Sequence, residues 1–201
     1  MNYPKDFSKL IEIYKSFSGI GEKNAERLAF ATFEMSDDKL KSFANVISNL
    51  KNSINICTIC GNISDSDVCS ICSDSNRNKD LICVVEDYKG LFSFEKSSAY
   101  NGTYHVLGGL ISPMDNINPD DLNISGLIKR VKDNTNAEII IALKSSIEGE
   151  MTMLYLKKVL SEYKVKVTRL SYGVPLGMNL EYMDVLSLNK ALEDRREIVD
   201  E

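Results

Sequence analysis

Apolar residues recur every three or four positions through the first quarter of the chain, a spacing typical of amphipathic helices. Residues 6–17 carry one such stripe, and a second follows from about residue 22 to 35, after the break Ser18-Gly19-Ile20-Gly21. Ser36, followed by two aspartates, has the character of a helix N-cap and acidic first turn. The third helix then places five apolar residues on one face: Leu40, Phe43, Ala44, Ile47 and Leu50. We therefore expect a small helical domain over residues 1–56.

The pattern changes to short apolar runs separated by helical stretches after residue 80. Strands are expected at 81–85, 103–107, 138–143 and 164–170, and helices at 88–96, 121–133 and 148–162. Ser145 and Glu148 have the spacing of a capping box at the start of the last of these helices. Strands that alternate with helices predict a parallel sheet covered by helices, here over residues 80–175. A polar stretch, 74–79, is expected to link this domain to what precedes it, and a tail over 176–201 contains a final helical pattern at 186–197.

Four cysteines stand between the two predicted domains, within residues 57–72. Cys57 and Cys60 form one C-x2-C pair, and Cys69 and Cys72 form a second after eight intervening residues. Paired turns of this kind can place four thiolates around one tetrahedral zinc ion. Disulfides or free thiols are the alternative, but disulfides are uncommon in cytosolic proteins. We predict one structural zinc ion in a compact four-cysteine finger, with no coordination position open for catalysis. The fifth cysteine, Cys83, lies in an apolar strand and is expected to be a core residue.

The break at residues 18–21 has the form of the turn in a helix-hairpin-helix. Gly19 and Gly21 permit a tight turn and the close approach of another backbone. The helix that follows begins with unpaired N–H groups, which suit a phosphate. Lys23 and Arg27, four residues apart, lie on one face of this helix, just after its N-terminus. The alternative is a plain turn with both cations in solvent. Contacts of this type hold the DNA backbone without reading sequence.

Charge restricts where DNA could bind. The net charge is −5, yet residues 1–56 hold 8 Lys or Arg against 7 Asp or Glu, so the acidic excess lies in the remainder. A nucleic-acid contact is therefore expected to be a local patch near the hairpin, with the zinc finger or Arg77 as the alternative positions. Hydrophobic residues make up 43% of the chain, which indicates a globular protein. No apolar run is long enough to cross a bilayer and no signal peptide is apparent, so a cytoplasmic, nucleoid-associated location is expected.

Carboxylates near two strand ends are the candidates for metal-dependent chemistry. Glu86 follows the first strand directly, where Toprim domains place an acid–base glutamate, but the Asp-x-Asp that these domains add after a later strand is absent. Glu148 and Glu150 could bind a metal in principle, although acidic residues in a helix's first turn more often complement its dipole. Lys144 at the same strand end would oppose a cation. The single histidine, His105, has no nucleophile beside it in sequence and is expected in the core or an interface.

Taken in order, the motifs resemble the RecR family of bacterial recombination mediators over nearly the whole chain. These motifs are the Gly-Ile-Gly hairpin, the paired cysteines, Val84-Val85-Glu86, Tyr104 to Gly109 with Ser112-Pro113, Glu148-Gly149-Glu150, Val167-Thr168-Arg169, Gly173 to Gly177, and Leu180-Glu181-Tyr182 with Ala191-Leu192. The chain departs from the family at Lys144-Ser145-Ser146, where Asn-Pro-Thr is usual, and at Met178, where a glycine is usual.

The resemblance implies a multidomain α+β and α/β protein with four parts. These are a helix-hairpin-helix domain (1–56), a four-cysteine zinc finger (57–72), a Toprim domain (80–175) and a C-terminal tail with a helix (176–201). It also implies a ring-shaped homotetramer that encircles DNA. Such a protein would act with RecO, and in some settings RecF, to load RecA onto single-stranded DNA, without enzymatic activity of its own.

The resemblance assigns zinc to Cys57, Cys60, Cys69 and Cys72, and DNA to Lys23 and Arg27 beside Gly19 and Gly21. The acidic strand-end residues Glu86, Glu148 and Glu150 would then be free to bind a protein partner. Two other functions stay open: a magnesium-dependent Toprim nuclease or primase-like enzyme that uses these glutamates, and a zinc-stabilised adaptor with no role on DNA.

Overall fold

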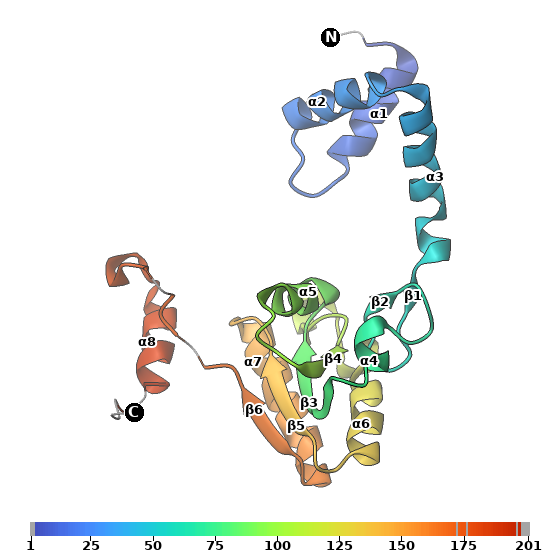
Figure 1. Cartoon of the computed structure of the whole chain (residues 1–201). Coiled ribbons are helices and arrows are strands. Elements are labelled where there is room, and N and C mark those ends of the chain that lie inside the picture. The colour runs from blue at the N-terminus through green and yellow to red at the C-terminus, as the bar shows by residue number, and fades with distance from the viewer. Residues whose placement is uncertain (1–2, 172, 176, 196, 198–201) are drawn as a thin grey trace. The chain divides into compact units, whose positions relative to one another are not determined.

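The computed structural model describes residues 3–171, 173–175, 177–195 and 197. The chain divides into two compact units, Met1–Ile54 and Asn55–Glu201. Figure 1 labels their helices and strands. Each unit has its own core, as expected when a helical domain precedes an α/β domain.

The N-terminal unit contains three helices: α1 (Lys5–Lys15), α2 (Glu22–Phe33) and α3 (Asp37–Ser53). Ile11 of α1 packs against Ala25 and Ala29 of α2, and the small alanine side chains let the two helices approach closely. Tyr14 and Thr32 add a hydrogen bond of 2.7 Å between them. The two helices that flank the turn are thus held together by a small, buried core and one side-chain hydrogen bond.

Helix α3 differs from the first two because none of its residues is buried. It begins after Ser36, but the Ser36 side chain makes no capping hydrogen bond. The apolar stripe predicted from the sequence is present and exposed, and Ile47 and Leu50 keep more than half of their surface in contact with solvent. The stripe is therefore not part of the buried core of this unit within the single chain. An apolar helix face of this length is typical of a contact with another surface.

The second unit is built on a four-stranded parallel sheet in the order β4-β3-β5-β6. Its strands are β3 (Asn78–Val85), β4 (Gly102–Val106), β5 (Glu138–Ala142) and β6 (Lys166–Arg169). The central pair is in register from Leu81 opposite Glu138 to Val85 opposite Ala142. Strand β3 begins three residues before the predicted start, so the end of the expected polar linker, residues 78–79, is part of the sheet. These positions are exposed, and this is why they have the composition of a linker.

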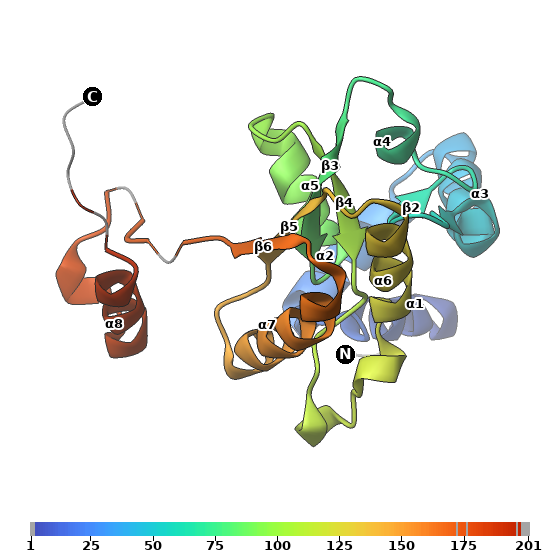
Figure 2. The same ribbon diagram turned by 90° about the horizontal axis from the view of Figure 1, so that it is seen from below.

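Helices cover both faces of this sheet, as Figure 2 shows. On one face α6 (Ile124–Asp133) and α7 (Ile147–Leu160) pack on Ile82, Val84, Ile139 and Ile141. On the other, α5 (Tyr88–Ser97) buries Leu91 against Val85 and Cys83. Short 3-10 turns lie at Pro113–Asp115 (η1), Pro119–Asp121 (η2), Ser161–Tyr163 (η3) and Leu180–Tyr182 (η4).

Ser146 caps α7, not Ser145 as predicted. Its side chain accepts a hydrogen bond of 3.2 Å from the amide of Gly149 and donates one of 2.7 Å to Glu148. The helix begins at Ile147, so the capping residue stands one position later than the sequence pattern indicated.

The remaining elements are short. Strands β1 (Asn55–Ile56) and β2 (Ile63–Ser64) pair antiparallel, and α4 (Ser70–Ser73) closes the cysteine-rich segment. Helix α8 (Val185–Glu193) falls in the stretch where the tail helix was expected; residue 196 of that stretch lies outside the described residues. Ion pairs join the tail to the sheet domain, from Arg169 to Asp194 at 2.6 Å and from Lys190 to Glu150 at 2.8 Å. No described helix has the length and hydropathy needed to cross a membrane.

Candidate zinc centre, strand-end carboxylates and hairpin

The cysteine segment gathers its four thiols into one buried cluster. The Sγ atoms of Cys57, Cys60, Cys69 and Cys72 all lie within 4.8 Å of one another. Cys60 Sγ and Cys69 Sγ, from the two different pairs, are 3.6 Å apart. The two predicted turns thus converge on one point, as a single tetrahedral ion requires.

Local hydrogen bonds shape the first turn. The amide of Gly61 donates to the carbonyl of Cys57 at 2.9 Å, and the amide of Cys57 donates to the carbonyl of Asn62 at 2.7 Å. Gly61 has a φ of +77°, and a Cβ atom there would lie 2.9 Å from the carbonyl oxygen of Val106. Glycine is therefore required twice, by the left-handed backbone and by the close approach of β4.

This close approach shows that the finger is docked on the sheet. The amide of Val106, on the outer side of the edge strand β4, donates to the carbonyl of Cys60 at 2.7 Å. The four cysteines belong to the same apolar cluster as Cys83, Val85 and Tyr104. The finger is thus part of the core of the sheet domain, a relationship that the cysteine spacing alone does not reveal.

The thiols have different proton affinities before metal binds. Burial raises the pKa of Cys57, but hydrogen bonds from the backbone of Cys69, Cys60 and Ile59 outweigh it and bring this pKa down to about 7. The pKa of Cys60 is raised by its hydrogen bond with Cys72 and by burial, and that of Cys69 is raised chiefly by burial. Cys57 is thus more readily ionised than Cys60 or Cys69, and metal binding must release protons from these two thiols.

These observations fit a structural zinc ion. The cluster offers four sulfur ligands and is buried, and the amide of Cys69 lies 3.3 Å from Cys57 Sγ as a hydrogen-bond donor. Zinc held by four thiolates ties the two turns together and leaves no position for a substrate or water. Among the described residues, this is the one group of three or more acidic, cysteine or histidine side chains close enough to share a metal ion.

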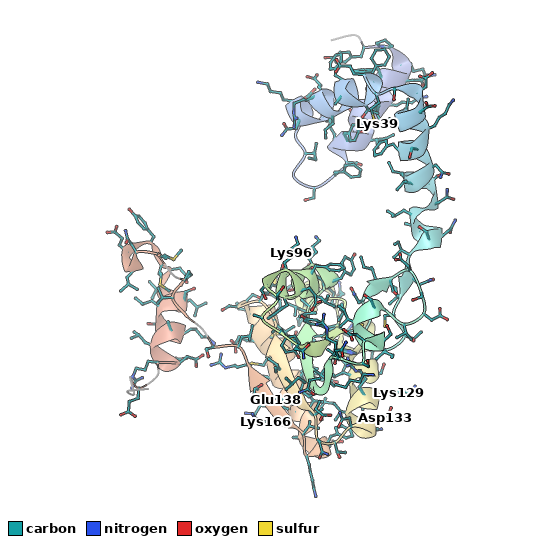
Figure 3. The ribbon with its side chains drawn as sticks, in the orientation of Figure 1. Lys39, Lys96, Lys129, Asp133, Glu138 and Lys166 are labelled. Atoms are coloured by element: carbon teal, nitrogen blue, oxygen red, sulfur yellow. The ribbon has the colours of Figure 1, made fainter. Side chains whose placement is uncertain are left out.

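The strand-end carboxylates do not gather in the same way. Glu86, directly after β3, faces Lys144 after β5, whose Nζ lies 3.4 Å from Glu86 Oε1. Glu148 accepts from the Ser146 hydroxyl, which lowers the pKa of this carboxyl, and Glu150 pairs with Lys190 of α8. Each of the three glutamates therefore has its own partner. The opposite ends of β5 and β6 carry another ion pair, Glu138 with Lys166, labelled in Figure 3.

His105 is buried in β4, in agreement with the expectation of a core histidine. Its Nε2 atom lies 2.6 Å from the carbonyl oxygen of Asn123, so this nitrogen carries the proton, and Nδ1 has no hydrogen-bond partner. Burial lowers the pKa of His105 to about 4.

Arg77, an alternative contact for DNA on sequence grounds, is engaged within the sheet domain. Its guanidinium forms two hydrogen bonds with Glu95, at 2.8 and 2.6 Å, and Glu95 also accepts from the Tyr104 hydroxyl at 2.6 Å. Glu95 therefore has a lowered pKa, chiefly because of Arg77. Because its guanidinium is already engaged in this bidentate ion pair with Glu95, Arg77 is poorly suited to bind a phosphate. No sequence signal pointed to Glu95, because 18 positions separate the partners.

The hairpin between α1 and α2 has open space around both glycines. Gly19 has a φ of +81°, whereas Gly21 is extended (φ −79°, ψ 167°) and occupies the N-cap of α2. A Cβ atom at either position would have nothing within 4 Å. The first amides of α2 to bond back are those of Asn24 and Ala25, both onto the Gly21 carbonyl, so the amides before them point out of the helix.

Both candidate cations follow this helix start. Lys23 and Arg27 are exposed on α2, and neither forms an ion pair with another described residue. The turn, the outward amides and the two cations thus lie together on one short segment.

Three family models match the chain. A RecR zinc finger domain of the four-cysteine type matches residues 54–74, a Toprim domain matches 80–171, and the RecR C-terminal segment matches 173–196. The chain belongs to the RecR family. Membership confirms the recognition made from sequence motifs, the zinc finger and the Toprim fold, and it gives the chain a role in recombinational DNA repair. The three matches begin at residue 54, so the helix-hairpin-helix at the start of the chain stays a prediction.

Proposed function

We propose that this RecR-family protein is a DNA-binding clamp that holds nucleic-acid backbone through its N-terminal hairpin. The observation that carries the proposal is the α1–α2 turn, where open space around Gly21 adjoins outward amides and two unpaired cations, Lys23 and Arg27. Amides at a helix start and nearby cations bind phosphate oxygens. Such contacts position a protein on DNA without reading its bases.

One hairpin of this kind should bind DNA weakly, because the chain as a whole has a net charge of −5. Assembly would overcome this weakness. The exposed stripe on α3, which contains Phe43, Ile47 and Leu50, favours contact with a second copy, since an apolar face of this kind in solvent is unfavourable. A homo-oligomer, which the family resemblance suggests is a ring tetramer, would present several hairpins and raise affinity through avidity.

The decisive experiment is a salt titration of DNA binding for the wild type and for Lys23→Ala/Arg27→Ala. Each phosphate contact releases counterions, so log affinity falls with log salt by about 0.9 per contact on duplex DNA. The variant should bind more weakly, with a shallower slope, and to a similar extent on all sequences.

The matched control is Lys39→Ala/Lys41→Ala, which removes two exposed cations from α3 of the same unit. It should leave the slope nearly unchanged. Equal slopes in the wild type and the hairpin variant would move the DNA site away from the hairpin. Complete absence of salt-dependent binding in the wild type would favour the zinc-stabilised adaptor.

We further propose that the strand-end region of the Toprim domain binds RecO, and that the assembly helps to load RecA onto single-stranded DNA, with RecF as a further partner in some settings. Glu86, Glu148 and Glu150 give this region three carboxylates near the carboxyl ends of the strands, where α/β folds place their ligands. The departure Lys144-Ser145-Ser146 lies in the same region.

Glu148→Lys tests the partner site. It should weaken RecO binding in a calorimetric titration while DNA binding survives. Glu162→Lys, an exposed charge reversal near the other end of α7, is the matched control and should bind RecO normally. Equal RecO affinity in the two variants would remove Glu148 from the interface.

A further inference from the structure

Arg130 of α6 lies against the edge strand of the sheet and has no acidic partner there. One guanidinium nitrogen donates to the Thr103 hydroxyl at 2.8 Å, and the other donates to the carbonyl of Tyr104. Both acceptors are uncharged. None of the ion pairs among the described residues includes Arg130. A partly buried cation without a carboxylate is costly unless another negative charge is near.

The zinc finger is a source of negative charge beside Arg130. Arg130 and Cys72 line the same cavity of about 310 Å³, together with Ile59 and Thr103. Asp133 also lines it, but this carboxylate is exposed and forms no ion pair with Arg130. Burial lowers the pKa of Arg130, and the thiolates of Cys72, Cys60 and Cys57 oppose that shift. Of the four cysteines, Cys72 is thus the one that shares this cavity with the guanidinium.

The charge of a four-cysteine site makes a nearby cation important. Four thiolates and one divalent zinc ion sum to a net charge of about −2. This charge lies in a buried cluster, where unbalanced charge is poorly solvated. The Cys69 amide supplies one partial positive charge. Arg130 supplies a full one, and its hydrogen bonds to β4 fix its position.

We propose that Arg130 is the counter-charge of the zinc-thiolate site and that it couples metal binding in the finger to α6 and β4 of the Toprim domain. Arg130 makes no direct bond to a sulfur atom, so it is a positioning residue that acts through charge. Groups that surround metal ligands commonly change metal affinity 10- to 100-fold when they are mutated.

The experiment measures zinc affinity by competition with a chromogenic chelator under reducing conditions, in the full-length protein. Arg130→Met should bind zinc at least about tenfold more weakly than the wild type, in the range seen for such surrounding groups. Arg130→Lys keeps the charge and should retain most of the affinity. Lys129→Met removes the neighbouring exposed cation on α6, labelled in Figure 3, and should change nothing.

A separate variant distinguishes the effect of the Arg130 charge from the effect of its hydrogen bonds. It also keeps the proposal testable if Arg130→Met does not fold. Arg130→Gln retains N–H groups that can donate to Tyr104 but carries no charge, so it should lose zinc affinity as Arg130→Met does. Two results would overturn the proposal. One is wild-type affinity in Arg130→Gln. The other is an Arg130→Lys protein that binds zinc as weakly as Arg130→Gln.

Discussion

The ammonium nitrogen of Lys144 lies 3.4 Å from a carboxylate oxygen of Glu86, across the carboxyl ends of the two central strands. From the sequence, Glu86 is expected at the position of the acid–base glutamate of Toprim enzymes, and Lys144 is expected to begin the segment where those enzymes carry an Asp-x-Asp. A cation now stands where a magnesium ligand would be needed. The pair is more than a third exposed on the lysine side, so its contribution to stability is small.

We predict that the purified protein has no turnover on nucleic acids. Magnesium needs several oxygen ligands at short range, and Lys144 opposes a second cation beside Glu86. Labelled single- and double-stranded DNA and RNA, incubated with the protein and magnesium, should show no cleavage, ligation or primer synthesis. Activity that is present in the wild type and lost in Glu86→Gln would instead support the nuclease or primase-like alternative.

Cys57→Ser should abolish stoichiometric zinc binding. The pKa of this thiol, about 7, makes it more readily ionised than Cys60 or Cys69, and metal binding and local folding share one free energy. Metal analysis should give about one zinc ion per wild-type chain and much less in the variant. Cys83→Ser, a buried cysteine outside the cluster, is the control and should keep its zinc. Full zinc in Cys57→Ser/Cys72→Ser would place the ion elsewhere.

Gly21→Ala should weaken DNA binding without destabilising the protein. The extended backbone of Gly21 accepts any residue, and the new Cβ atom meets nothing within 4 Å, but it occupies the space through which a phosphate approaches α2. Gly19→Ala provides the contrast, because a φ of +81° makes alanine cost about 1 kcal/mol of stability. Thermal unfolding and DNA titration of both variants separate the two effects. Normal DNA binding by Gly21→Ala would argue against close approach at the hairpin.

Ile47→Asp should shift the protein toward the monomer. This exposed residue lies at the middle of the apolar stripe on α3, and a buried charge in a contact between copies is costly. Asn52→Asp adds the same charge to an exposed polar position of α3 and should leave the assembly intact. Light scattering measures both. An unchanged mass for Ile47→Asp would show that α3 does not hold the oligomer together.

His105 should make stability depend on pH below neutrality. Its pKa is about 4 in the folded state and about 6.5 when unfolded, so the unfolded chain binds more protons between these values. Stability is therefore fully present above pH 6.5 and falls as pH drops toward 4, by on the order of 3 kcal/mol. His105→Gln keeps a donor for Asn123 and should flatten this dependence in urea unfolding. A parallel pH profile for the variant would assign the effect to other groups.

The sequence was most informative where one physical signal dominated. The buried strands were predicted because a continuous apolar run as short as 81–85 is typical of a strand covered on both faces, and the cysteines because metal geometry restricts their spacing. The start of β3 at Asn78 was missed because its exposed first residues are polar. Ser145 and Ser146 are adjacent serines, so only backbone conformation decides that Ser146 caps α7.

Contacts between distant segments could not be read in the same way. The exposure of the apolar stripe on α3 could not be predicted, because an apolar stripe does not say which surface will cover it. Arg77 and Arg130 were likewise indistinguishable from solvent-exposed cations, since Glu95 and the zinc finger lie far away in sequence. The carboxylates were placed at the correct strand ends, but their pairing with Lys144 and Lys190 depends on segments up to 58 positions apart.

The hydrogen bond from Val106 to the carbonyl of Cys60 has a consequence for the protein in cells short of zinc. If the ion is lost and the finger loosens, the backbone groups on the outer edge of β4, such as the amide of Val106, lose their hydrogen-bond partners. An exposed edge strand with unpaired N–H and C=O groups can pair with strands of other chains, and such pairing leads to aggregation. Metal starvation would then remove this repair protein by precipitation while each hairpin, in the other unit, was still intact. Zinc in this family member would thus keep the protein soluble. The amount of protein available for DNA repair would then depend on the supply of zinc.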